Sequence, residues 1–184
     1  IEDIALLYVQ GLGARGAVHL IDHYGSAEAV YSASVGSLVA DMGLRKDIAE
    51  GIVNGEGLSM AKREVDYCRR HGICMVAATD KEYPAPLRET VDRPHVLFVK
   101  GDIEVLSAPS LSMVGTREMS PSGQHITNRL IEDLASEVDN FTIVSGIAYG
   151  IDAACHRAAI THKVPSVAVL ANALPDINPA PHRQ

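Results

Sequence analysis

The feature that most constrains the fold is a repeated strand, turn and helix pattern between residues 111 and 170, with glycines in both turns. Three short apolar runs, at residues 111–114, 141–144 and 167–170, are typical of buried parallel strands. Helix-forming residues separate these runs, and parallel neighbours need such crossover connections. The order therefore predicts an α/β fold with a parallel sheet.

The first turn begins at Gly115, directly after the first apolar run, and continues through Thr116 and Arg117. Ser120 then supplies a hydroxyl suited to a helix N-cap, and Pro121 suits the first helical position. These residues predict a helix start, followed by Gly123. Apolar residues recur on one face of the expected helix, which should pack on the sheet: Ile126, Leu130, Leu134 and Val138, widened by Ile131 and Ala135.

The second turn repeats this construction from Ser145 and Gly146 to Gly150, where a glycine permits close approach or a positive φ. A helix is predicted over residues 151–161, with Asp152 complementing its N-terminal partial charge. His156 follows Asp152 by four residues, which permits a hydrogen bond between the two side chains. Such a bond suits a structural support of the turn, with a catalytic acid/base pair as the alternative, because no activated nucleophile stands beside them.

Both turns place backbone N–H groups at a helix N-terminus, where a phosphate can be held. The dinucleotide fingerprint requires three glycines, whereas residues 115–123 contain two, and residues 146–150 lack the lysine of a P-loop. What remains is a phosphate-binding surface at the carboxyl ends of adjacent strands. The alternative is that these glycines only make tight turns.

Composition limits the chemistry further. The chain has 16 Lys and Arg against 23 Asp and Glu, a net charge of −7, so a broad basic stripe for nucleic acid is not expected. No apolar run approaches the roughly 20 residues that span a bilayer, and no signal peptide opens the chain, so we expect a cytoplasmic protein without membrane contact. The three cysteines fit no metal spacing and are expected to be buried and reduced, and we expect no cofactor.

The chain divides into two predicted domains. Residues 1–55 suggest a small all-helical domain, in which a Gly-Leu-Gly turn at residues 11–13 resembles a helix-hairpin-helix or a sterile-alpha-motif bundle. This module either contacts DNA, with Arg15 as its nearest cation, or serves packing and protein contacts. Residues 56–184 suggest an extended Rossmann-like domain whose sheet is joined by strands at residues 73–77 and 96–99. Only three of the usual five or six strands follow, which favours a truncated sheet.

Several blocks together resemble the DNA-processing protein family DprA, also called Smf. They are the Gly115 to Gly123 turn, the segment SGIAYGIDAACH at residues 145–156, and residues 71–89, 93–102 and 166–179. The resemblance spans nearly the whole chain in order. One departure lies near its end, where Ala171 and Ala173 replace family glycines and Asn178 replaces an aromatic residue.

The resemblance implies a non-enzymatic protein that binds single-stranded DNA and helps load the recombinase RecA onto it in natural transformation. It implies that Arg117 contacts a DNA phosphate and that the full-length protein forms a homodimer. Its other implied DNA-binding residues are Gly115, Thr116, Ser120, Gly123, Ser145, Gly146 and Gly150. The alternative is a nucleotide-binding phosphoribohydrolase-like enzyme of related fold, whose catalytic motif would lie beyond the present sequence.

Overall fold

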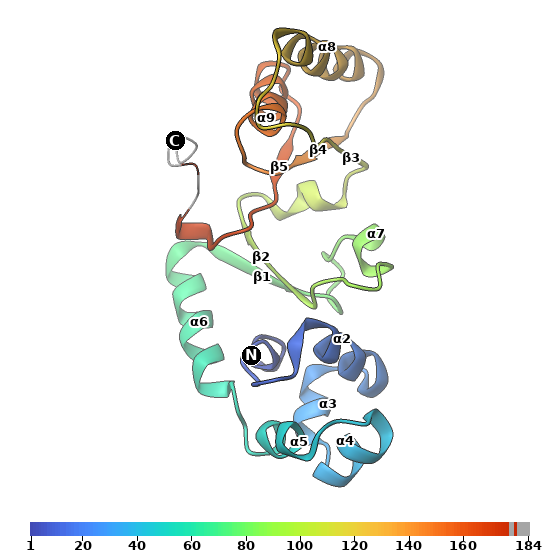
Figure 1. Cartoon of the computed structure of the whole chain (residues 1–184), viewed down its shortest axis with the longest axis vertical. Coiled ribbons are helices and arrows are strands. Elements are labelled where there is room, and N and C mark those ends of the chain that lie inside the picture. The colour runs from blue at the N-terminus through green and yellow to red at the C-terminus, as the bar shows by residue number, and fades with distance from the viewer. Residues whose placement is uncertain (177–178, 180–184) are drawn as a thin grey trace. The chain divides into compact units, whose positions relative to one another are not determined.

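The structure is a computed structural model that describes residues 1–176 and 179 of the chain. It consists of two compact units, Ile1–Gly101 and Asp102–Gln184 (Figure 1). Seven helices and a two-stranded sheet make up most of the first unit, whereas the second unit contains a parallel sheet and two long helices. The predicted α/β class, with a helical region before a parallel sheet, is confirmed.

Five short helices form the beginning of the first unit, and their boundaries follow local signals. Gly25 ends the second helix with a φ of 86°, and the Ser26 hydroxyl accepts a hydrogen bond from the Ala29 N–H at 3.1 Å, which starts the third. Their apolar faces meet in one core that includes Leu20, Leu38 and Ile52. The helices are α1 (Glu2–Leu6), α2 (Gly13–Tyr24), α3 (Ala27–Ser32), α4 (Val35–Met42) and α5 (Lys46–Val53).

The rest of the first unit is built on α6 (Leu58–His71), which packs against α1 and leads into β1 (Ile73–Ala77). Strand β1 pairs antiparallel with β2 (Val96–Lys100), and the loop between them contains the short helix α7 (Ala85–Arg88). The prediction that these two strands join the main sheet is wrong. They form a separate sheet, because the connecting loop returns the chain alongside β1 and the two strands satisfy one another's backbone groups.

This connecting loop is held by buried and charged groups. Tyr83 is buried, and its hydroxyl donates a hydrogen bond to the Pro94 carbonyl oxygen at 2.5 Å. Arg93 forms an ion pair with Asp22 of α2. The loop is therefore tied both to its own end and to the helices of the same unit.

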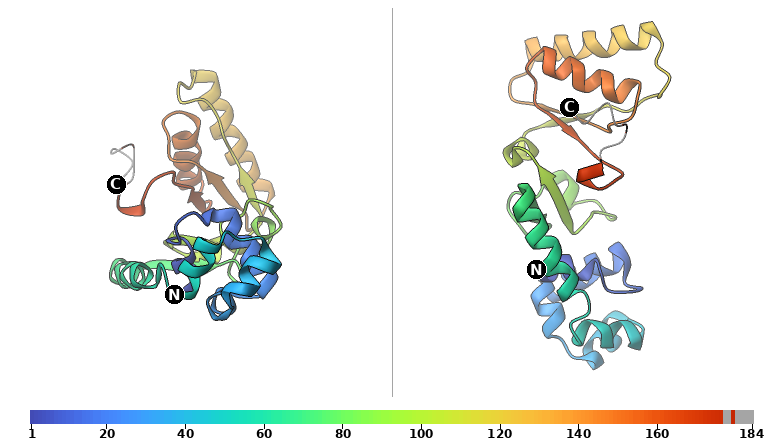
Figure 2. Two further views of the ribbon diagram at one scale, coloured as in Figure 1. Left: turned by 60° about the horizontal axis from the view of Figure 1, so that its bottom comes forward. Right: turned by 90° about the vertical axis from the view of Figure 1, so that its left-hand side faces the viewer.

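The second unit has the predicted order of strands and helices. After the 3₁₀ helix Ile103–Ser107, strands β3 (Ser110–Ser112), β4 (Thr142–Ser145) and β5 (Ser166–Ala168) pair in parallel, with β4 in the centre. Helices α8 (Pro121–Glu137) and α9 (Ile151–Thr161) connect them and cover the same face of the sheet (Figure 2). The 3₁₀ helix Leu174–Asp176 follows, and Asn178 lies outside the described residues.

The face of α8 that packs inward differs from the predicted one. Ile131 is fully buried and Leu134 packs beside it, whereas Ile126 is 64% exposed and Leu130 and Val138 also face outward. The reason is the neighbouring helix α9, because Ile131 packs in one core cluster with its small residues Cys155, Ala158 and Ala159. The inward face of α8 is therefore the one that packs closely on α9, and it is not the face with the most apolar residues.

The cysteines divide between core and surface. Cys68 and Cys155 are buried, as expected, and all three cysteines are free thiols. The expectation of burial is wrong for Cys74, which is exposed because alternate residues of β1 point to opposite sides of the strand. Residues 1–55 share one compact unit with residues 56–101. The domain boundary at residue 55 stays a prediction.

Candidate functional site

The first turn, residues 113–120, connects β3 to α8 and contains half of the predicted DNA-binding residues, among them Arg117. Ser120 is the N-cap of α8, and its hydroxyl accepts a hydrogen bond from the Gly123 N–H at 3.1 Å, while Pro121 takes the first helical position. The Thr116 hydroxyl accepts a bond from the Glu118 N–H at 3.1 Å. Side chains of the turn therefore satisfy the Glu118 and Gly123 N–H groups, and these two donors are not open to a ligand.

The second turn, residues 146–150, connects β4 to α9 and is held by three side chains. The Asp152 carboxylate accepts a bond from the Ala148 N–H at 3.3 Å. The His156 Nε2 atom lies 2.8 Å from the Gly146 carbonyl oxygen, so it carries the proton, and Nδ1 accepts from the Ser166 hydroxyl at 3.1 Å. The predicted bond between Asp152 and His156 is wrong, because each side chain bonds a different part of the turn.

The two turns are docked directly onto one another. The Ile151 N–H at the start of α9 donates a hydrogen bond to the Thr116 carbonyl oxygen at 3.1 Å. Gly150 has a φ of 80°, and a Cβ atom there would overlap this same oxygen and lie 2.8 Å from the Arg117 Cα. A Cβ on Gly115 would lie 2.5 Å from the Ile151 side chain. Gly150 therefore allows the backbones of the two turns to touch, and Gly115 makes room for the Ile151 side chain, so both positions require a residue without a Cβ atom.

A further bond joins the strands below the turns. Ser145 is buried at the end of β4, and its hydroxyl donates to the Met113 carbonyl oxygen at 2.7 Å. The first turn is therefore bonded to the second at two places: between Met113 and Ser145 at the strand ends, and between Thr116 and Ile151 at the start of α9. The predicted residues of the two turns are thus brought together in one rigid structure.

Arg117 lies at the surface of this structure. Its side chain is exposed and, within the part of the chain that the structure describes, makes no hydrogen bond or ion pair. Thr116 and Ser120 beside it are also exposed. Ser145 is the opposite case, because it is buried and its hydroxyl is already bonded. Among the predicted residues, the guanidinium of Arg117 is therefore the group best placed to meet an anion.

Tyr149 is a surface residue that the sequence patterns did not single out. It precedes Gly150 in the second turn, and its side chain is 53% exposed. Hydropathy patterns do not report the exposure of a single aromatic residue in a turn. An exposed ring on the turn that faces Arg117 is a candidate for contact with a nucleic-acid base.

Cys155 is a buried thiol on α9, the helix that follows the second turn. Burial raises the pKa of the Cys155 thiol, with a smaller contribution from the charge of Asp152, so this cysteine stays protonated at neutral pH. Within residues 1–176 and 179, no group of three His, Cys, Asp or Glu side chains is arranged to hold a metal ion.

None of the described helices is both long and apolar enough to cross a membrane.

The glycine turn of the N-terminal helices has its nearest cation already bonded. Arg15 forms an ion pair with Asp92 through two hydrogen bonds, one of them 2.7 Å long. This cation is engaged within its own unit, which favours the packing alternative for that turn.

A family model described as DNA recombination-mediator protein A matches residues 74–184. Among curated proteins, the chain is 35% identical over 117 residues to DNA processing protein DprA of Bacillus subtilis (strain 168), an alignment that covers 63% of this chain and 39% of that protein. It is 38% identical over 108 residues to Protein Smf of Escherichia coli (strain K12), covering 59% of this chain and 28% of that protein.

A solved structure resembles nearly the whole chain. The X-ray structure of DNA processing protein A from Streptococcus pneumoniae matches with a TM-score of 0.80 over 97% of this chain and 60% of that chain, at 24% sequence identity. This likeness shows that the two chains share a fold. In each of these comparisons the chain spans less than two thirds of the relative's length.

Proposed function

The chain belongs to the family of DNA recombination-mediator protein A, and we propose that it binds single-stranded DNA at the two docked turns. The observation that carries this proposal is the exposed, unpaired guanidinium of Arg117 on a turn that packing holds in place. A guanidinium can bind phosphate oxygens through two parallel hydrogen bonds. In this proposal Gly115, Thr116, Ser120 and Gly123 shape the loop around Arg117.

The facing turn supplies shape and rigidity in this proposal. Ser145, Gly146 and Gly150 form its backbone, and Asp152 and His156 support it through their separate hydrogen bonds. Because the Ile151 and Gly123 N–H groups are already bonded within the protein, phosphate binding depends on Arg117 more than on helix donors. The net charge of −7 also favours a few placed contacts over a broad basic surface.

The proposal extends to partners. The description of the family as a recombination mediator supports a role in loading the recombinase RecA onto bound DNA. The names of the relatives, DNA processing proteins of several bacteria, support a DNA ligand. A non-enzymatic role in the cytoplasm and a homodimer of the full-length protein are part of the same proposal and rest on the family resemblance.

Replacing Arg117 by alanine tests the site directly. The variant is expected to bind a single-stranded oligonucleotide about 10- to 150-fold more weakly, because a hydrogen bond to a charged group contributes about 1.5–3 kcal/mol. Fluorescence anisotropy at fixed salt measures this change. Arg129→Ala is the matched control, since Arg129 is on α8 and already paired with Asp133 at 3.0 Å. Equal affinity of the Arg117 variant and wild type would refute the assignment, and Tyr149→Leu in the same titration tests the neighbouring ring.

The alternative function is that of a phosphoribohydrolase-like enzyme acting on a nucleoside monophosphate. We expect no release of free base when the full-length protein is incubated with nucleoside monophosphates, and tighter binding of single-stranded than of duplex DNA. Chromatography of the reaction mixture detects the base. Steady base release that disappears in the Arg117 variant would favour the enzyme.

A further inference from the structure

A basic surface lies on α6, far along the sequence from the two turns. Four cations occur within its 14 residues, Lys62, Arg63, Arg69 and Arg70, a quarter of the 16 Lys and Arg in the chain. All four side chains are exposed. Such a concentration is unexpected in a protein with a net charge of −7.

Helical geometry places these cations on one side of α6. Lys62 and Arg69 are seven residues apart, as are Arg63 and Arg70, so each pair is nearly aligned along the helix at a separation of about 10.5 Å. The opposite side holds the buried residues Ala61, Val65 and Cys68. The two rows lie about 100° apart around the helix, with Asp66 between them, and together they form a solvent-facing surface that we call the α6 basic face.

The α6 basic face is unpaired, unlike the other cations near it in sequence. Within residues 1–70 the remaining cations all form ion pairs: Arg15 with Asp92, Arg45 with Asp47 and Lys46 with Glu50. The four on α6 form none in the described part of the chain, although the Arg70 Nε atom donates to the Asp66 carbonyl oxygen at 3.1 Å. The free positive charge of this region is thus gathered on one helix face.

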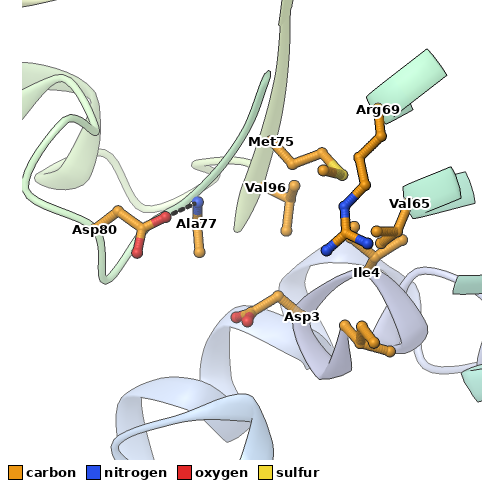
Figure 3. Close-up of a pocket in the computed structure, with 9 residues that line it drawn as sticks. Asp3, Ile4, Val65, Arg69, Met75, Ala77, Asp80 and Val96 are labelled. Atoms are coloured by element: carbon orange, nitrogen blue, oxygen red, sulfur yellow. Dashed lines mark hydrogen bonds between the residues drawn. The ribbon is translucent and has the colours of Figure 1, made fainter. Parts of the chain in front are cut away.

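Nearby acidic groups offset this charge only in part. Asp66 shares the face, and Glu2 on α1 lies close enough to interact electrostatically with Lys62. Arg69 and Asp3 both line a pocket between α6 and α1 (Figure 3), yet no ion pair joins them. On α6 itself the four cations stand against Asp66 and Glu64, and Glu64 is half-buried at the edge of the packed side, where it accepts a hydrogen bond from the Tyr8 hydroxyl at 3.3 Å. The solvent-facing side of the helix therefore stays positive.

Stabilisation of the helix explains the positions of only two of these four cations. Arg69 and Arg70 lie in the last turn of α6, where cations interact favourably with the helix dipole. Lys62 and Arg63 lie in the N-terminal half, where a cation gains nothing from the dipole. Their presence in line with Arg69 and Arg70 therefore points to an external anion.

We propose that the α6 basic face binds the phosphate backbone of single-stranded DNA as a second contact surface of this protein. The inference rests on the proposed function, because membership of a DNA-processing family identifies the polyanion as DNA. The rings of Tyr67 and His71, stacked with centroids 3.9 Å apart, flank Arg63 and Arg70 on the helix. Aromatic rings beside cations are typical of surfaces that bind single strands.

The test compares two variants that each lose one Lys and one Arg from the same unit. Lys62→Gln/Arg69→Gln removes charges from the α6 basic face, whereas Arg45→Gln/Lys46→Gln removes ion-paired charges from α5 and its N-cap. Affinity of the full-length protein for a single-stranded oligonucleotide is measured across a salt series. The slope of log affinity against log salt reports the number of phosphates neutralised.

The α6 variant is expected to bind about tenfold more weakly at low salt and to lose about 1.4 from the magnitude of the slope, because each phosphate contact on a single strand contributes about 0.7. The α5 control should keep the wild-type slope. Circular dichroism checks that both variants fold. If the α6 pair unfolds, Arg63→Gln/Arg70→Gln makes the same measurement on the other row.

The outcomes separate this inference from the proposed function. An unchanged slope in the α6 variants, with weaker binding by Arg117→Ala, would overturn the α6 basic face and leave the turns as the DNA site. Wild-type protein that binds no single-stranded DNA would overturn the proposed function and this inference with it. Displacement of the oligonucleotide by an equal charge of polyglutamate would show an acidic protein as the better ligand and would also overturn the assignment to DNA.

Discussion

Replacing Gly150 by alanine is expected to destabilise the second unit by at least about 3 kcal/mol and to abolish DNA binding at the turns. Gly150 has a φ of 80° and a ψ of −130°, a conformation that residues with a side chain rarely adopt. An added Cβ would also overlap the Thr116 carbonyl oxygen, which accepts the hydrogen bond from Ile151. The substitution therefore combines backbone strain with separation of the two turns.

Denaturant unfolding measures the loss of stability, and an oligonucleotide titration measures the loss of binding. Gly123→Ala is the control near the start of α8, because its φ is not positive and the nearest atom to an added Cβ lies at 3.4 Å. Alanine is favoured over glycine inside a helix by up to about 1 kcal/mol, so this control should be as stable as wild type or more so. Comparable stability of both variants would show that the turns are not held by close contact at Gly150.

The local features of the second unit could be predicted from the sequence because each rests on neighbouring residues. Ser120 and Pro121 specify the start of α8, and Gly150 begins α9 at the predicted residue, since capping and positive φ are properties of a few adjacent residues. The parallel order of β3, β4 and β5 followed from the spacing of apolar runs. The strand ends shifted by one or two residues, as pairing partners decide where a ladder stops.

The errors arose where partners distant in sequence decide the outcome. Strands β1 and β2 pair with one another, and nothing in either apolar run distinguishes that pairing from membership of the larger sheet. The inward face of α8 depends on the small residues of α9. The side chains of Asp152 and His156 share a helix face, yet the backbone of the folded turn offers each a better partner.

The positions of the site residues could be predicted from the sequence, whereas the hydrogen bonds that they form could not. The turn residues come together as expected, but the sequence could not show that Ile151 and Gly123 already use their N–H groups within the protein. Nor could it show that the cations of residues 1–70 outside α6 are paired while those of α6 are not. Both facts depend on which acceptors the fold brings near each donor. They shift the proposed DNA contacts from backbone donors to arginine side chains.

Replacing Gly57 by alanine is expected to destabilise the first unit by at least about 3 kcal/mol. Gly57 is the N-cap of α6, with a φ of 88°, and an added Cβ would overlap the Ala5 carbonyl oxygen of α1 and lie 3.2 Å from the Tyr8 Cβ. Because the contacted oxygen belongs to the backbone, a change of side-chain rotamer cannot relieve the overlap. The first turn of α6 must then move away from α1.

Gly72 at the other end of α6 provides the matched control. It is the C-cap, with a φ of 64°, and an added Cβ would meet no atom within 4 Å. Gly72→Ala should therefore lose only the cost of the left-handed conformation, about 1–2 kcal/mol. Hydrogen exchange of the α6 amides, measured together with denaturant unfolding, localises the difference between the two variants. Equal losses in Gly57→Ala and Gly72→Ala would mean that strain alone sets the cost, and that close packing on α1 is not what positions the basic face of α6.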